Sequence, residues 1–175
     1  MTSKSNIPGG EGSDFRRPLL DRLLESDGRD DSGEVDPIPL ALVMLAEVDD
    51  MLGGIARSLQ ASDPDTPALS RGTVWQFFPL LRAVCSALIS GAAVKYPQAV
   101  REPDASDTQA DNWIREAMLD LCGVVEKFMD VLVEKGTLDS PVMNLADLEA
   151  IVGRLANIRF ALVTGMGLRD GLEPA

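Results

Sequence analysis

The chain has 175 residues, 45% hydrophobic and 25% charged, which is enough for one globular domain with a core and too short for two ordinary domains. Its 28 acidic and 16 basic residues give a net charge of −12, which repels nucleic-acid phosphates and anionic lipid headgroups. No basic cluster offsets that repulsion, so we expect no nucleic-acid partner and favour a protein partner with basic groups.

Histidine is absent from the sequence, which removes the usual base of serine and cysteine hydrolases and the usual ligand of helical metal sites. We therefore expect no catalytic residue, no cofactor and no metal ion. Cys85 and Cys122 show no Cys-x-x-Cys spacing and each lies in an apolar helical pattern, which predicts buried free thiols, with a disulfide between helices as the alternative. Free thiols and the lack of an apolar secretion signal predict a cytoplasmic protein, with signal-less export left open.

Residues 1–36 are rich in Gly, Ser and Asp and are expected to form a disordered acidic tail. Within them, residues 14–26 predict a short amphipathic helix, because five apolar residues recur at helical spacing. Such a short helix is unstable alone in water, so we expect it to order only against this domain or against a partner. The five predicted partner-binding residues of this segment are Phe15, Leu19, Leu20, Leu23 and Leu24.

The first helix of the domain is predicted to follow Asp36 and to run over residues 37–60, with prolines confined to its first turn. Its apolar stripe is Leu45, Val48, Leu52, Ile55 and Leu59. Asp49 and Asp50 fall on the acidic outer edge of the helix, and we interpret both as solvated carboxylates that steer a partner.

A loop is predicted over residues 61–72, followed by the least polar segment, a central helix over 74–95. Pro79 predicts a kink or a start delayed to Phe77. Arg82 lies beside the apolar stripe and is a candidate groove cation for an acidic ligand. A stripe of small residues would let another helix, or a second copy of the chain in a homo-oligomer, approach closely. This stripe comprises Ala83, Ala87 and Gly91.

The third helix is predicted to open at Asp107 or Thr108 with a capping box to Asp111, and to end at Lys135 before a glycine. Its apolar stripe, expected to face the core, is Ile114, Met118, Leu121, Val125, Phe128 and Leu132. A fourth helix is predicted from an Asn144 cap to a stop at residues 164–167. Its stripe is Leu148, Ile151, Leu155, Ile158 and Leu162, and Arg159 beside it is the second candidate groove cation.

No alternating strand pattern occurs, so the sequence predicts an all-α four-helix bundle, up-down-up-down, over residues 37–168, between the N-terminal tail and a C-terminal tail over 169–175. The expected function is that of a non-catalytic protein-protein interaction module: an adaptor, chaperone, immunity or regulatory protein. The alternative is a bundle that docks on or inserts into a membrane through the apolar helix over 74–95.

Overall fold

The computed structural model describes residues 36–171, and the chain divides into one unit over residues 1–35 and a second over 36–175. The described part is mostly helical, as the sequence predicted, with five helices and two short strands. In chain order these are α2 (Pro37–Ser58), β1 (Pro67–Ser70), α3 (Arg71–Lys95), α4 (Pro97–Val100), α5 (Gln109–Val133), β2 (Pro141–Asn144) and α6 (Leu145–Arg169).

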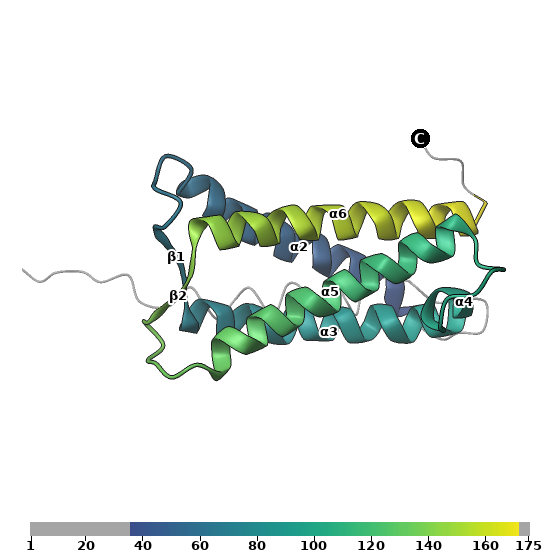
Figure 1. The fold of residues 1–175 in the computed structure, drawn as a ribbon, viewed down its shortest axis with the longest axis horizontal. Coiled ribbons are helices and arrows are strands. Elements are labelled where there is room, and N and C mark those ends of the chain that lie inside the picture. Colours follow the sequence, from purple (N-terminus) through teal and green to yellow (C-terminus); the bar gives the residue numbers. More distant parts are fainter. Residues whose placement is uncertain (1–35, 172–175) are drawn as a thin grey trace, which may run out of the picture. The chain divides into compact units, whose positions relative to one another are not determined.

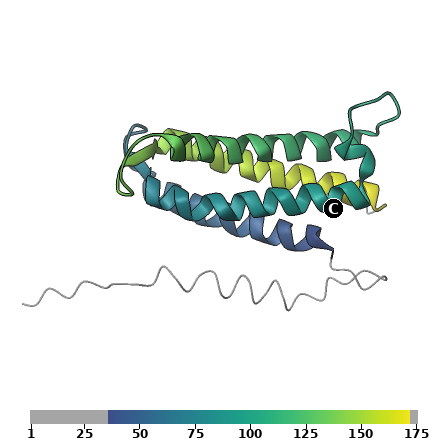
Figure 2. The ribbon, with the colours of Figure 1, turned by 90° about the horizontal axis from the view of Figure 1, so that it is seen from below.

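Each of the four long helices packs against two others: α2 and α5 both contact α3 and α6 (Figures 1 and 2). The strands lie at one end of these helices and α4 lies at the other (Figure 1). One apolar core runs between the helices, and every long helix contributes at least one fully buried leucine to it. Four of these leucines, one from each helix, are Leu45, Leu81, Leu121 and Leu155.

The helices begin where side chains cap their free backbone N–H groups. Thr108 and Asp111 form the predicted capping box of α5, and Asn144 caps α6 by accepting from the N–H of Asp147. Ser70 caps α3 in the same way, so α3 begins before the range expected for it. The predicted delay of its start to Phe77 is therefore wrong, and Pro79 lies inside the helix.

The strands β1 and β2 pair antiparallel within segments for which the sequence predicted loops. Leu69 and Met143 are partners in the register and are the buried side chain of their strands. A strand of four residues with one buried side chain is too short to show an apolar alternation, which explains why the sequence pattern did not reveal it.

Residues 37–169 form two similar halves, α2-β1-α3 and α5-β2-α6, a repeat that the sequence pattern did not reveal. The first two residues of α3 and of α6 make equivalent backbone hydrogen bonds to the other half. Arg71 N–H donates to Ser140 O (2.9 Å), as Leu145 N–H donates to Thr66 O (2.9 Å). Gly72 N–H donates to Leu138 O (2.7 Å), as Ala146 N–H donates to Pro64 O (3.0 Å). Because equivalent strands pair antiparallel, the two halves are related by an approximate two-fold rotation.

The correspondence continues along α3 and α6 to two glycines where helices approach closely. A Cβ on Gly91 would lie 2.6 Å from Ile38 of α2, and a Cβ on Gly165 would lie 2.9 Å from Ile114 of α5. At Gly91 another helix, α2, approaches closely, as the small-residue stripe predicted, and contact with a second copy of the chain stays a prediction. The predicted end of the last helix is corrected, because α6 continues through Gly165 to Arg169.

Alanine substitutions at two glycines of α6 should have opposite effects on stability. Gly165→Ala is expected to lower the free energy of unfolding by about 1–3 kcal/mol, because its methyl group would overlap Ile114 and press on the Ala110 carbonyl. A Cβ on Gly153 would have no atom within 4 Å, so Gly153→Ala should raise the free energy of unfolding by up to about 1 kcal/mol through helix propensity. Urea titration followed by circular dichroism measures both. Equal effects would show that α6 does not approach α5 as closely as described.

Candidate functional site

Exposed apolar side chains gather where the C-terminal end of α5 meets the N-terminal end of α3. Three hydrogen bonds join the start of α3 to the end of α5 and the loop after it. Arg71 Nη1 donates to the Leu132 carbonyl (2.7 Å), the Arg71 N–H to the Ser140 carbonyl (2.9 Å) and the Gly72 N–H to the Leu138 carbonyl (2.7 Å). The exposed side chains are Trp75 (62%), Met129 (46%), Val133 (78%) and Leu138 (63%). We call these four residues the seam patch.

Helix geometry places these side chains on neighbouring edges of the two helices. Trp75 follows Arg71 by one turn, and Arg71 reaches across to α5, so Trp75 lies on the edge of α3 that is turned toward α5. Met129 lies two turns beyond Cys122, which contacts Cys85 of α3, so Met129 lies on the facing edge of α5. Val133 continues that edge by one more turn.

The composition of the seam patch is typical of a protein-binding surface. Tryptophan is enriched among the residues that dominate binding energy, and methionine adapts its shape to different partners. Single exposed apolar residues are common on protein surfaces, whereas a cluster of them often marks a binding site. The helical pattern places Trp75 outside the core stripe of its helix. It does not show which residues of α5 lie near Trp75, because they are far away in the sequence.

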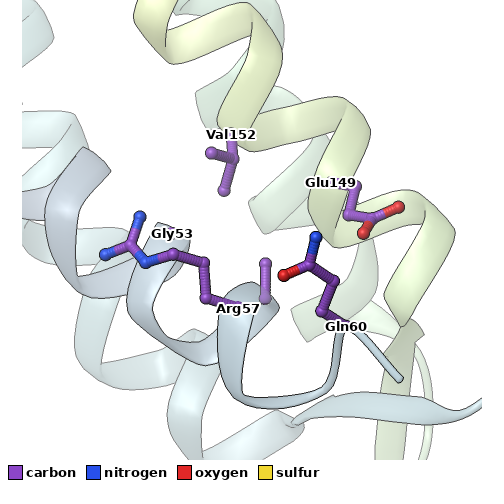
Figure 3. A pocket seen from close by; sticks show the side chains of 6 residues that line it. Gly53, Arg57, Gln60, Glu149 and Val152 are labelled. Carbon is purple, nitrogen blue, oxygen red and sulfur yellow. The ribbon is translucent and has the colours of Figure 1, made fainter. Parts of the chain in front are cut away.

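A small open pocket between α2 and α6 is the other candidate (Figure 3). Its volume is about 170 Å³, and its lining comprises Gly53, Ala56, Arg57, Gln60, Glu149 and Val152. Pockets that enclose small molecules usually measure about 300–1,000 Å³. Although Arg57 and Glu149 bring charge to its rim, this hollow is too small and open to enclose such a ligand.

The predicted acidic edge of α2 is corrected at Asp49. Its side chain is buried (8% exposed), and Arg159 Nη1 of α6 lies 3.0 Å from its carboxylate. Burial raises the pKa of Asp49, and the positive charge of Arg159 opposes that rise. The pair therefore joins α2 to α6, and the roles of Asp49 and Arg159 in binding a partner or ligand stay predictions. Asp50 is exposed, as expected, and its role in steering a partner stays a prediction.

The other predicted site residues fall into two groups. Arg82 is exposed on α3, and its role as a cation for an acidic ligand stays a prediction. The five apolar residues of the N-terminal segment lie outside the described residues and stay predictions. These are Phe15, Leu19, Leu20, Leu23 and Leu24.

A buried arginine that the sequence pattern did not single out holds the loop before α5. Arg115 is 9% exposed and donates to two backbone carbonyls and two side chains. The acceptors are Gln98 O (2.6 Å), Arg101 O (3.2 Å), Asp107 Oδ2 (2.6 Å) and Asn112 Oδ1 (2.7 Å). The Asp104 N–H and the Arg115 guanidinium lower the pKa of Asp107. Because its donors already have partners, Arg115 stabilises the fold and does not await a ligand.

The two cysteines lie together on α3 and α5, with their Sγ atoms 3.3 Å apart. Cys85 is buried and Cys122 is half-buried. Burial, together with the hydrogen bond to Cys122, raises the pKa of Cys85 to about 12. Within the described residues, no group of three or more His, Cys, Asp or Glu side chains could hold a metal ion.

Comparisons of this chain with protein-family models, with curated proteins and with solved structures found no match. Its function is therefore inferred from the surface and the contacts of the chain itself.

Proposed function

We propose that the chain is a non-catalytic protein-protein interaction module that binds a protein partner through the seam patch. The observation that carries this proposal is the exposure of Trp75, Met129, Val133 and Leu138, which helix geometry places on neighbouring edges of α3 and α5 and in the loop after α5. Burying these side chains against a partner would remove apolar area from water, which is the main favourable term in association.

The scaffold that we propose is a four-helix bundle with up-down-up-down connections. The contacts of each long helix with two neighbours support this arrangement, as does the two-fold relation between the halves. In such a scaffold the edge between α3 and α5 is rigid, because both helices also pack on the core. A rigid apolar edge loses little conformational entropy when it binds.

The charge of the chain indicates the kind of partner. With a net charge of −12, association with a basic protein is accelerated and association with acidic surfaces is disfavoured. Asp50 and the N-terminal segment over residues 14–26 are further proposed contacts. Adaptor, chaperone, immunity and regulatory roles all use such a surface, and the partner's identity would separate them.

A membrane-docking or membrane-inserting bundle is the second candidate. Two helices, α3 and α6, are long and apolar enough to cross a membrane, with mean hydropathies of 1.8 and 1.3. This is weak support, because the core helices of ordinary globular domains pass the same test. Insertion would also have to withdraw Leu81 and Leu88 from the core, where both are fully buried.

Site-specific photo-crosslinking tests the interaction proposal. A benzophenone amino acid is placed at position 75 of the full chain in its native cell, and Phe160, an exposed aromatic residue on α6, is the matched control position. We expect a discrete protein adduct at position 75 and none at 160. Combining Trp75→Ala with Met129→Ala should reduce capture of the adducted protein by about tenfold or more.

Equal adduct yields at positions 75 and 160 would contradict the role of the seam patch. A separate variant with Leu20→Ala and Leu23→Ala tests the N-terminal segment, and a loss that persists at high salt would mark an apolar contact. If no protein is crosslinked and liposomes alone recruit the intact chain, the membrane candidate takes the place of the interaction module.

A further inference from the structure

We propose that Cys85 and Cys122 form a disulfide that ties α3 to α5 when the protein meets a low-molecular-weight disulfide oxidant such as oxidised glutathione. Their Sγ atoms are already 3.3 Å apart, in contact across the two helices. A disulfide bond is about 2.05 Å long, so the sulfurs need to move together by little more than about 1 Å. Side-chain rotation can supply a movement of that size.

The two-fold relation between the halves allows the Cys85 position in α3 to be compared with the equivalent position in α6. Cys85 stands in α3 where Arg159 stands in α6, and the α3-α5 contact corresponds to the α6-α2 contact. At the second contact Arg159 forms an ion pair with Asp49 at 3.0 Å. Both contacts between long helices of different halves therefore carry a side-chain cross-link, which is an ion pair between α2 and α6 and a thiol pair between α3 and α5. Of these two cross-links, the thiol pair is the one that can become covalent.

The reaction proceeds by two thiol-disulfide exchanges. The half-buried Cys122 thiolate attacks oxidised glutathione, which gives a mixed disulfide and releases one reduced glutathione. The Cys85 thiolate then attacks the sulfur of Cys122 and releases the second glutathione. Two protein thiols are oxidised, one glutathione disulfide is reduced to two thiols, and the protons of the cysteines pass to the departing thiolates through solvent. Because burial raises the pKa of the Cys85 thiol, the second step should accelerate as the pH rises.

The disulfide would change how the two halves move relative to each other. The covalent bond restricts the unfolded chain by closing the loop between residues 85 and 122, so the oxidised protein should unfold at a higher temperature. It would also fix the edge between α3 and α5 that carries the seam patch, and it would prevent α3 from leaving α5. Formation of the bond depends on the contact between the sulfurs and does not depend on the proposed function.

The test uses the full chain, incubated with oxidised glutathione at pH 8. We expect the intact mass to fall by that of two hydrogen atoms and peptide mapping to find Cys85 linked to Cys122. The melting temperature should rise by about 10 °C and return to its starting value with dithiothreitol. Cys122→Ser and Cys85→Ser, each checked for helical circular dichroism, should show no such rise.

Stable glutathione adducts on both cysteines, a covalent dimer, or no reaction under excess oxidant would each overturn the proposal. If Cys85→Ser fails to fold, Cys122→Ser and the linked-peptide measurement still decide the question. A linked peptide without a rise in melting temperature would confirm the bond and contradict its effect on the helices.

Discussion

Replacing Phe128 with alanine is expected to lower the free energy of unfolding by about 3–5 kcal/mol. Phe128 lies on α5, is fully buried, and is among the largest side chains of the core. Its removal loses apolar contacts and leaves a cavity that rigid neighbouring helices can fill only in part. Since a domain of this size is stable by about 5–15 kcal/mol, such a loss would be a large share of the total. Urea titration followed by circular dichroism measures it.

The adjacent residue on α5 provides the control. Lys127 is exposed, so Lys127→Ala should change the free energy of unfolding by less than about 0.5 kcal/mol. Leu121→Ala, at another fully buried position of the same helix, should cost about 2–5 kcal/mol. If Lys127→Ala proved more costly than Phe128→Ala, the face of α5 that is directed at the core would be misassigned.

The helices were predictable because their signals are local. Apolar residues recur every three or four positions in each long helix, and caps such as Thr108 and Asn144 use contacts within three residues. Helix ends were less accurate. The glycine at position 165 predicts the end of a helix. The helix continues through it because α5 approaches closely there and packing outweighs the weak helix propensity of glycine.

The features that the sequence did not predict depend on residues far apart in the chain. The pairing of β1 with β2 and the two similar halves appear only when the backbone bonds are compared. The helical pattern puts Asp49 on the acidic outer edge of its helix, and nothing local shows that Arg159 lies opposite. Charge alone therefore could not separate the buried Asp49 from the exposed Asp50.

The seam patch could not be predicted from the sequence for the same reason. Trp75 lies in α3 and Met129 in α5, and their proximity follows from the bonds that join residues 71–72 to residues 132–138. The helical pattern does show that Trp75 is outside the core stripe. It could not show whether another helix covers it, which is what distinguishes a core residue from a binding residue.

Replacing Arg115 with alanine is expected to lower the free energy of unfolding by about 2–4 kcal/mol. The guanidinium is buried, and its loss would leave the carbonyls of Gln98 and Arg101 without their charged donor and Asp107 with one arginine contact in place of two. Because these groups belong to the segment between α4 and α5, that segment should open first. Hydrogen exchange of residues 97–107 and urea titration measure the two effects.

An exposed arginine separates this effect from a general loss of charge. Arg154 of α6 pairs with Asp120 at 3.2 Å, and both side chains are largely in water. Solvent screening leaves such a pair worth little, so Arg154→Ala should change the free energy of unfolding by less than about 0.5 kcal/mol and leave exchange over residues 97–107 unaltered. Similar costs for the two substitutions, or an Arg115→Ala protein with unchanged exchange in that segment, would show that the loop does not depend on the buried guanidinium. The alternative anchor would then be Arg101, which also contacts Asp107 but does so from the surface.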